Sequence, residues 1–96
     1  MAADAFEILF RPEVEDDLRA LDRRLQKRIL AALRTRLSDH PHQYGTPLGG
    51  KLAGLRRIRT GDYRIAYQIK AKQVVIWAVI HRKDIYAELE RRSGKT

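Results

Sequence analysis

The sequence feature that most constrains the fold is an alternation of apolar and polar residues on both sides of Gly61-Asp62, in LRRIRTGDYRIAYQI. This pattern predicts two antiparallel strands joined by a two-residue turn, and glycine in the first turn position suits a type II′ turn. With that turn Arg59 lies opposite Arg64, and directly opposed residues share one face of the sheet. We therefore expect Ile58, Ile65 and Tyr67 on one face of the hairpin and Arg57, Arg59 and Arg64 on the other.

The predicted arginine face is costly, because like charges directly opposite each other in a sheet are destabilising. Folding alone gives no reason to pair Arg59 with Arg64, whereas an anion held between the two side chains would. The whole chain has the same bias, with 20 Lys and Arg against 12 Asp and Glu, a formal charge of +8 and a pI near 10.3. This charge favours a polyanionic partner such as nucleic acid or an acidic protein.

The rest of the sequence predicts one small domain over residues 1–96. A helical region begins at Pro12, and its apolar stripe continues to Leu37 as one long helix or two, with Asp22 as a candidate N-cap of the second. The basic residues on the opposite side of this region are expected to form a solvated face made of Arg23, Arg24, Lys27, Arg28, Arg34 and Arg36. The other expected elements are a strand at Phe6–Phe10, a loop at His40–Gly50, a central strand at Gln73–Ile80, a short helix at Asp84–Arg92 and a loose tail at Ser93–Thr96.

These elements predict an α+β fold in which the last three strands form an antiparallel meander. A helical hairpin packs on one face of this small antiparallel sheet and a short C-terminal helix ends the chain. The leucine-rich stripe of the helical region is buried against the sheet, so we expect the other sheet face to be left for the arginines.

Several classes of protein are disfavoured by composition. There is no cysteine, so disulfides and thiolate metal sites are excluded, and His40 and His42 have no acidic cluster near them in the sequence. We expect no metal and no cofactor. VVIWAVI is far shorter than the roughly 20 residues of a membrane helix, and the first ten residues lack the features of a signal peptide. The expectation is a cytoplasmic protein without a membrane partner.

Three segments taken in order, KLAGLRRIR, GDYRIAY and IHRKDIY, resemble the RelE/ParE superfamily of bacterial and archaeal toxins, with the RelE branch the closer match. The resemblance extends from Phe6 to about Arg92. RelE-like toxins are ribosome-dependent endoribonucleases that cut messenger RNA in the decoding site, and a cognate antitoxin neutralises them. The resemblance therefore implies a toxin of a type II toxin-antitoxin system that acts on messenger RNA in the A site of the 70S ribosome. It also implies an acidic antitoxin partner and a toxin-antitoxin hetero-oligomer.

The resemblance also suggests roles for individual residues. Arg57 and Arg59 match two basic residues on the strand before the hairpin turn, Arg64 matches the arginine after it, Arg82 matches an arginine that helps protonate the leaving oxygen, and Tyr86 matches a tyrosine that contacts RNA. Lys51, Arg56 and Lys83, in the same segments, are expected to bind RNA. The best-known members have lysines in place of Arg57 and Arg59, and arginine is a poor general base because it stays protonated.

His81 is the remaining candidate for a general base, because the unperturbed pKa of histidine is about 6.5 and the residue is expected to border the same basic face. A purely structural His81 is the alternative. Two other functions stay open at the level of the sequence. One is inhibition of DNA gyrase, as in the ParE branch, and the other is a non-catalytic module that binds RNA or an antitoxin, since phosphate clamps bind as readily as they catalyse.

Overall fold

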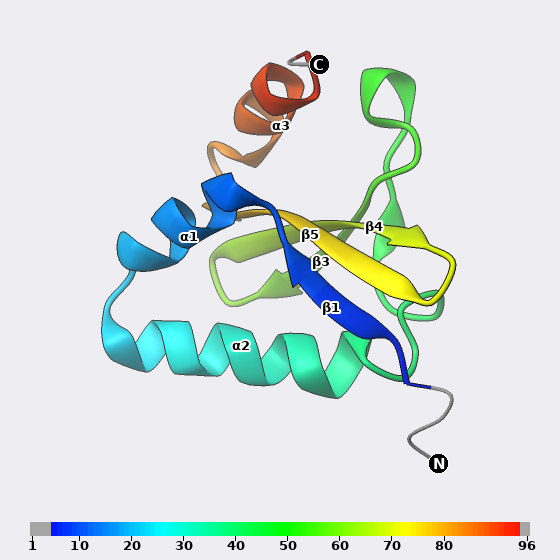
Figure 1. Cartoon of the computed structure of the whole chain (residues 1–96). Helices are drawn as coiled ribbons and strands as arrows, with labels where there is room; N and C mark the ends of the chain where they lie inside the picture. The colour runs from blue at the N-terminus through cyan, green and yellow to red at the C-terminus, as the bar shows by residue number, and fades with distance from the viewer. Residues whose placement is uncertain (1–4, 95–96) are drawn as a thin grey trace.

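The computed structural model describes residues 5–94 (Figure 1). The elements in chain order are β1 (Glu7–Phe10), α1 (Pro12–Arg19), α2 (Arg23–Leu37), β2 (Thr46–Pro47), the 3₁₀ turn η2 (Gly50–Leu52), β3 (Arg56–Thr60), β4 (Tyr63–Lys70), β5 (Gln73–His81) and α3 (Ile85–Ser93). The expectations for the first ten residues and for the tail fall partly outside the described residues, at 1–4 and 95–96. The segment expected to be only a loop contains β2, and η2 begins at its last residue.

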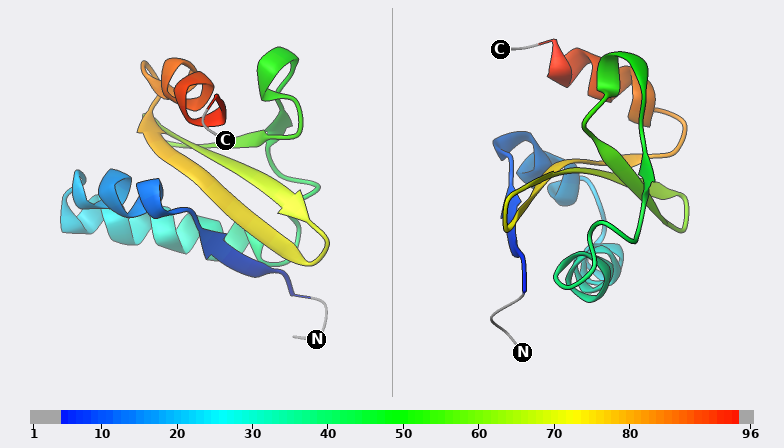
Figure 2. Two further views of the ribbon diagram at one scale, coloured as in Figure 1. Left: turned by 45° about the horizontal axis from the view of Figure 1, so that its top comes forward. Right: turned by 90° about the vertical axis from the view of Figure 1, so that its right-hand side faces the viewer.

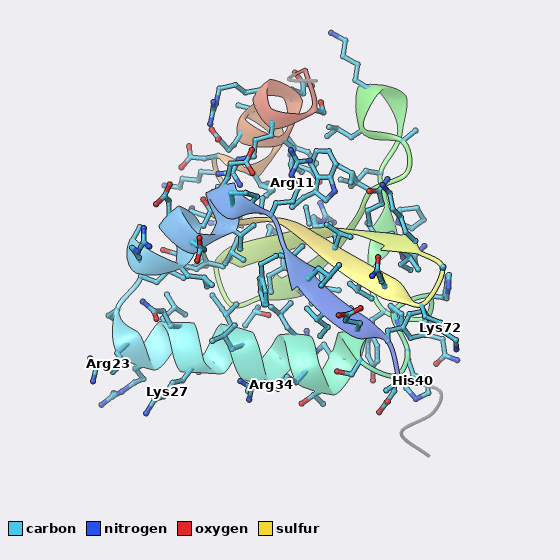
Figure 3. All side chains as sticks on the ribbon, viewed as in Figure 1. Arg11, Arg23, Lys27, Arg34, His40 and Lys72 are labelled. Carbon is cyan, nitrogen blue, oxygen red and sulfur yellow. The ribbon has the colours of Figure 1, made fainter. Side chains whose placement is uncertain are left out.

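The helical region consists of two helices. Asp22 caps the second, since its side chain accepts a hydrogen bond of 2.8 Å from the backbone N–H of Leu25, which confirms the predicted N-cap. Pro12 occupies the first turn of α1, as expected, and acidic residues follow it at the positive end of the helix dipole. On the outer side of α2, Arg23, Lys27 and Arg34 project away from the sheet (Figure 3). They form the solvated basic face that the sequence predicted.

The five strands form one sheet in the order β1-β5-β4-β3-β2. Strands β3, β4 and β5 make the predicted antiparallel meander, and β2 adds a short antiparallel edge. β1 pairs in parallel with β5, so the sheet is mostly antiparallel rather than wholly so. The sequence predicted β1 as a strand but not its partner, because the pairing joins opposite ends of the chain. The α+β architecture is as predicted.

The β3–β4 hairpin has the predicted register. Arg59 pairs with Arg64 and Ile58 with Ile65 across the turn at Gly61-Asp62. Gly61 has a φ of +61°, whereas Asp62 does not have a positive φ, as a type II′ turn requires. A bulge between Ala66 and Tyr67 interrupts the pairing of β4 with β5.

Both faces of the sheet carry a core. One face packs against α1 and α2 through a cluster whose largest members include Ile29, Leu33, Ile65, Tyr67 and Ile76. On the opposite face, α3 and the segment around η2 cover the sheet through Leu52, Leu55, Ala66, Ala78, Ile85 and Leu89 (Figure 2). The expectation that this second face is left for the arginines is therefore wrong for its middle. The arginines occupy the part toward the Gly61-Asp62 turn.

Candidate nucleic-acid interface

Four arginines gather near the β3–β4 turn. Arg57 and Arg59 come from β3, Arg64 from β4, and Arg82 directly follows β5. The backbone N–H of Arg82 donates to the Asp62 carbonyl at 2.8 Å, and its Nε lies 3.8 Å from Asp62 Oδ1. These contacts extend the β4–β5 ladder by one residue and bring Arg82 beside the turn.

The side chain of Arg64 folds back over the hairpin turn. Its Nη1 donates to the carbonyl oxygens of Gly61 and Tyr63, both at 3.1 Å. Desolvation is the largest cause that lowers the pKa of the Arg64 guanidinium, followed by the positive charges of Arg59, Arg57 and Arg82, and Asp62 partly opposes the effect. Arginine stays protonated despite such a shift, so the cluster keeps its mutual repulsion, which a bound anion would relieve.

Tyr86 lies beside this cluster at the start of α3. The residue is 43% exposed, so it does not serve to fill the core. Its hydroxyl accepts a hydrogen bond from Arg57 Nη1, and its ring centroid lies 5.8 Å from Arg57 Cζ. An exposed aromatic ring next to guanidinium groups is suited to stack on a nucleotide base while the arginines bind phosphate.

A hollow of about 510 Å³ adjoins the cluster at the β3 edge of the sheet, lined by Arg36, Tyr44, Gly45, Thr46, Arg57, Ile58 and Arg59. Arg36 reaches it from α2, and its Nη1 donates to the Arg59 carbonyl at 2.9 Å. Tyr44 is 42% exposed. The sequence predicted no site role for either residue, and the expectation that Arg36 lies on the solvated outer face of the helical region is wrong. The sequence did contain a signal for Arg36: this residue follows Leu33 by three positions, so the two side chains lie on the same, inward side of the helix.

Arg56, expected to bind RNA, has a different position. It pairs with Tyr67, on the side of the sheet that α1 and α2 cover. Its Nη2 donates to the carbonyl oxygens of His42 at 2.9 Å and of Tyr44 and Gly45, both at 3.2 Å. The expectation for Arg56 is therefore corrected: its guanidinium fastens the loop before β2 instead of facing the arginine cluster.

His81 also lies away from the arginine cluster. It pairs with Tyr63, and the two rings meet edge to face at 5.5 Å between centroids. Its Nδ1 accepts a hydrogen bond of 3.2 Å from the backbone N–H of Lys83, and the residue lines a hollow that also includes Asp16 of α1. The expectation that His81 borders the arginine face is wrong, because the alternation of side chains along β5 turns this position toward the face that α1 and α2 cover.

Lys51 and Lys83 are both exposed, the first in η2 and the second between β5 and α3. Their role in RNA binding stays a prediction. Within residues 5–94 no group of three or more His, Cys, Asp and Glu side chains is placed to hold a metal ion. Nor is any helix in this range long and apolar enough to cross a membrane. The chemistry available to the cluster is that of guanidinium groups and a phenol.

The sequence and the fold are similar to those of known toxins. Residues 8–86 match the family described as the ParE toxin of the type II toxin-antitoxin system parDE. The chain belongs to this family, which confirms its resemblance to the RelE/ParE superfamily. Comparison with curated proteins gives no match.

Solved structures of toxin-antitoxin complexes resemble the chain. The RelBE2 complex from Mycobacterium tuberculosis contains a chain that is 32% identical, with a TM-score of 0.72, and the match covers 81% of this chain and 99% of that one. A chain of the RelB-RelE complex from Methanococcus jannaschii is 25% identical, with a TM-score of 0.64 and coverage of 83% and 96%. A chain of the archaeal RelE-RelB complex from Pyrococcus horikoshii is 25% identical, with a TM-score of 0.62 and coverage of 80% and 94%.

Proposed function

We propose that this toxin is an endoribonuclease that cleaves messenger RNA bound in the A site of the 70S ribosome, in the cytoplasm, and so inhibits translation. The observation that carries the proposal is the convergence of Arg57, Arg59, Arg64 and Arg82 with the exposed phenol of Tyr86. Guanidinium groups bind phosphate oxygens through paired hydrogen bonds, and an aromatic ring offers a base a surface to stack on. The cluster thus has the parts needed to hold one phosphate and its neighbouring base.

The proposed reaction needs no metal and no covalent enzyme intermediate. The 2′-hydroxyl oxygen of RNA attacks the adjacent phosphorus, the bond to the 5′-oxygen breaks, and a cyclic phosphate and a 5′-hydroxyl result. The 2′-hydroxyl loses its proton, and the leaving oxygen gains one. Arg57, Arg59 and Arg64 stabilise the negative charge of the pentacovalent transition state. Arg82 donates a hydrogen bond to the leaving oxygen, and water takes up the 2′-hydroxyl proton and supplies the proton that the leaving oxygen gains.

The cluster itself lacks a good general base. Its arginines stay protonated, and His81 lies against Tyr63 on the face of the sheet that α1 and α2 cover. We therefore favour the account in which alignment of the 2′-hydroxyl supplies much of the catalysis, with the ribosome holding the message in line. Cleavage of naked RNA should then be much slower than cleavage of ribosome-bound message. Equal rates on the two substrates would contradict this dependence.

An acidic antitoxin is the proposed protein partner. The related chains from M. tuberculosis and M. jannaschii were solved in toxin-antitoxin complexes, and the net charge of +8 favours an acidic segment over the basic surface. We expect a toxin-antitoxin hetero-oligomer whose association slows markedly from about 0.1 M to about 1 M salt, as the Debye length falls from about 10 Å to about 3 Å. An association rate that is indifferent to salt would argue against this interface.

Inhibition of DNA gyrase is a second candidate function, favoured by the description of the matching family as ParE toxins. It would use the same scaffold without RNA chemistry. Primer extension on messages from cells that briefly express the toxin separates the two, because cleavage creates new 5′ ends and gyrase inhibition does not. A supercoiling assay with purified gyrase is the complementary measurement. Inhibition of gyrase without new 5′ ends would overturn the nuclease proposal.

A further inference from the structure

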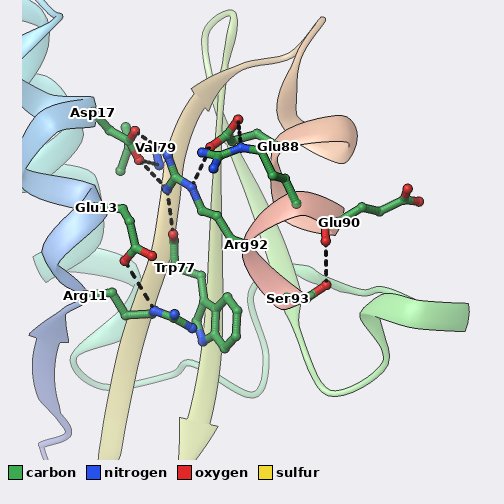
Figure 4. Close-up of polar contacts among 10 residues, drawn as sticks. Arg11, Glu13, Asp17, Trp77, Val79, Glu88, Glu90, Arg92 and Ser93 are labelled. Atoms are coloured by element: carbon green, nitrogen blue, oxygen red, sulfur yellow. Dashed lines mark hydrogen bonds and ion pairs between the residues drawn. The ribbon is translucent and has the colours of Figure 1, made fainter. Parts of the chain in front are cut away.

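Arg92 is an arginine near the end of the last helix, yet only 5% of its side chain is exposed. Its two terminal nitrogens donate to the two carboxylate oxygens of Asp17 at 2.8 and 2.7 Å (Figure 4). Nη1 also donates to the Trp77 carbonyl at 2.9 Å, and Nε donates to Glu88 Oε2 at 2.9 Å. All three nitrogens of the guanidinium are therefore engaged, with partners on α1, β5 and α3.

Asp17 completes the network from the other side. Its side chain is 6% exposed, and Oδ2 also accepts the backbone N–H of Val79 at 3.0 Å. The hydrogen bonds that Arg92 donates to Asp17 are the largest cause that raises the pKa of the Arg92 guanidinium, and burial opposes this effect. Both oxygens of Asp17 and every nitrogen of Arg92 thus have partners, as a buried charged pair requires.

A buried ion pair of this kind is weak support for stability, because apolar side chains of similar volume often hold a fold as well or better. A bidentate pair of this kind does restrict the relative orientation of the two elements that it joins, here α1 and α3. Ile85 and Leu89 hold α3 on the sheet through apolar contacts, which leave some freedom of rotation, whereas the planar guanidinium fits Asp17 in one orientation. Tyr86 lies six residues before Arg92 on this helix, so the rotation of α3 sets where its ring points.

We propose that Arg92, paired with Asp17, is a positioning residue that fixes the rotation of α3 and so holds Tyr86 against Arg57. One part of this inference rests on the proposed function: the contact between the Tyr86 ring and RNA would depend on the buried pair between Arg92 of α3 and Asp17 of α1. The geometric part concerns the protein alone and can be measured without RNA.

Fluorine NMR on protein labelled with fluorotyrosine tests the geometry. The chain has four tyrosines, so few resonances are expected, and Tyr86→Phe assigns the one of interest. We expect Arg92→Ala to move the Tyr86 resonance in the direction caused by Arg57→Ala, and to leave Tyr63 and Tyr67 unchanged. Arg91→Ala is the matched control, since Arg91 is exposed and shares Glu88 with Arg92 but makes no contact with Asp17, so its loss should move none of them.

Two outcomes would overturn the positioning role. One is an unmoved Tyr86 resonance in folded Arg92→Ala. The other is movement of Tyr63 and Tyr67 together with Tyr86, which would show a general loss of packing. If Arg92→Ala does not fold, Arg92→Lys takes its place, because lysine keeps the charge without the planar fork. It should move the Tyr86 resonance in the same direction by a smaller amount, and an unmoved resonance in this variant would also overturn the inference.

Cleavage by the same variants separates this inference from the proposed function. A misplaced ring should lower the single-turnover rate on ribosome-bound message by roughly tenfold to a hundredfold in Arg92→Ala, and Arg91→Ala should keep the parental rate. If the parent makes no new 5′ ends while the resonances behave as expected, the nuclease proposal fails and the positioning role stands. If the parent cleaves and the Tyr86 resonance does not move, the positioning role fails alone.

Discussion

The two faces of the β3–β4 hairpin come from alternating residues of the same two strands and contribute to stability with opposite signs. On the face that α1 and α2 cover, Ile58 and Ile65 oppose each other and are 4% and 0% exposed. On the other face, Arg59 and Arg64 oppose each other near solvent and repel. The apolar pair stabilises the hairpin enough to keep the charged pair in register. The difference is the reason that we propose an anion-binding role for the arginine face.

The apolar side of the comparison should show the largest effect on stability. Ile65→Ala removes a fully buried side chain from the larger core and leaves a cavity, so we expect the free energy of unfolding to fall by about 2–5 kcal/mol. Toxicity would be lost only as far as the protein unfolds. Urea denaturation measures the change, and a loss below about 1 kcal/mol would show that the core tolerates the cavity.

The adjacent residue should behave in the opposite way. Arg64→Ala removes a charge that faces Arg59, so we expect thermal stability to be unchanged or slightly raised and toxicity to be abolished, with cleavage slowed by roughly a hundredfold or more. Growth arrest and thermal melting of the same variant test both parts. Arg34→Ala, on the outer side of α2, is the control for charge alone. A large fall in Tm for Arg64→Ala would reassign the residue to structure.

The sequence predicted one side of this comparison better than the other, for a local reason. Alternation around Gly61-Asp62 gave the hairpin register and the two faces correctly, because strand pairing across a tight turn is a short-range property. The pairing of β1 with β5, the cover that α3 provides and the Asp17–Arg92 pair all join segments far apart in the chain, and no local pattern carries them. The expectations for Arg56 and His81 were wrong because they rested on charge and on the chemistry of histidine, whereas the alternation of side chains along a strand decides which face each residue occupies.

Tyr67 offers a test of the buried side through pH. Burial raises the pKa of its phenol, and its hydroxyl donates toward the carbonyl oxygens of Pro41 at 2.9 Å and Tyr44 at 2.6 Å. The raised pKa means that the native state keeps this proton longer than the unfolded state. The stabilisation is therefore complete below the unfolded pKa of about 10 and is lost as pH rises through the folded value.

We expect Tyr67→Phe to cost about 1–3 kcal/mol near neutral pH, because the Pro41 carbonyl loses its donor and the Tyr44 carbonyl keeps only Arg56. The variant should also weaken the fall in stability above about pH 10. Urea midpoints at neutral and alkaline pH, for the parent and the variant, measure both effects. Tyr44→Phe, which alters an exposed phenol, is the control. Parallel alkaline curves for the parent and Tyr67→Phe would show that another group is responsible.

His81 is expected to give the smallest effect, and it tests whether the two faces act separately. The residue packs against Tyr63 on the helix side, and its Nδ1 accepts the Lys83 N–H, so it does not face the arginine cluster. A general base at this position would make the cleavage rate rise with pH through an ionisation around 6 to 7, and His81→Ala would then remove that rise. The geometry favours the other outcome, in which the parent and His81→Ala have coincident profiles on pre-bound ribosomal complexes and their rates differ by less than about threefold. A hundredfold loss of rate in a folded His81→Ala variant with unchanged binding would instead show that His81 carries a proton, and the active site would then extend around the end of β5. Coincident profiles would leave catalysis to alignment and charge on the arginine face.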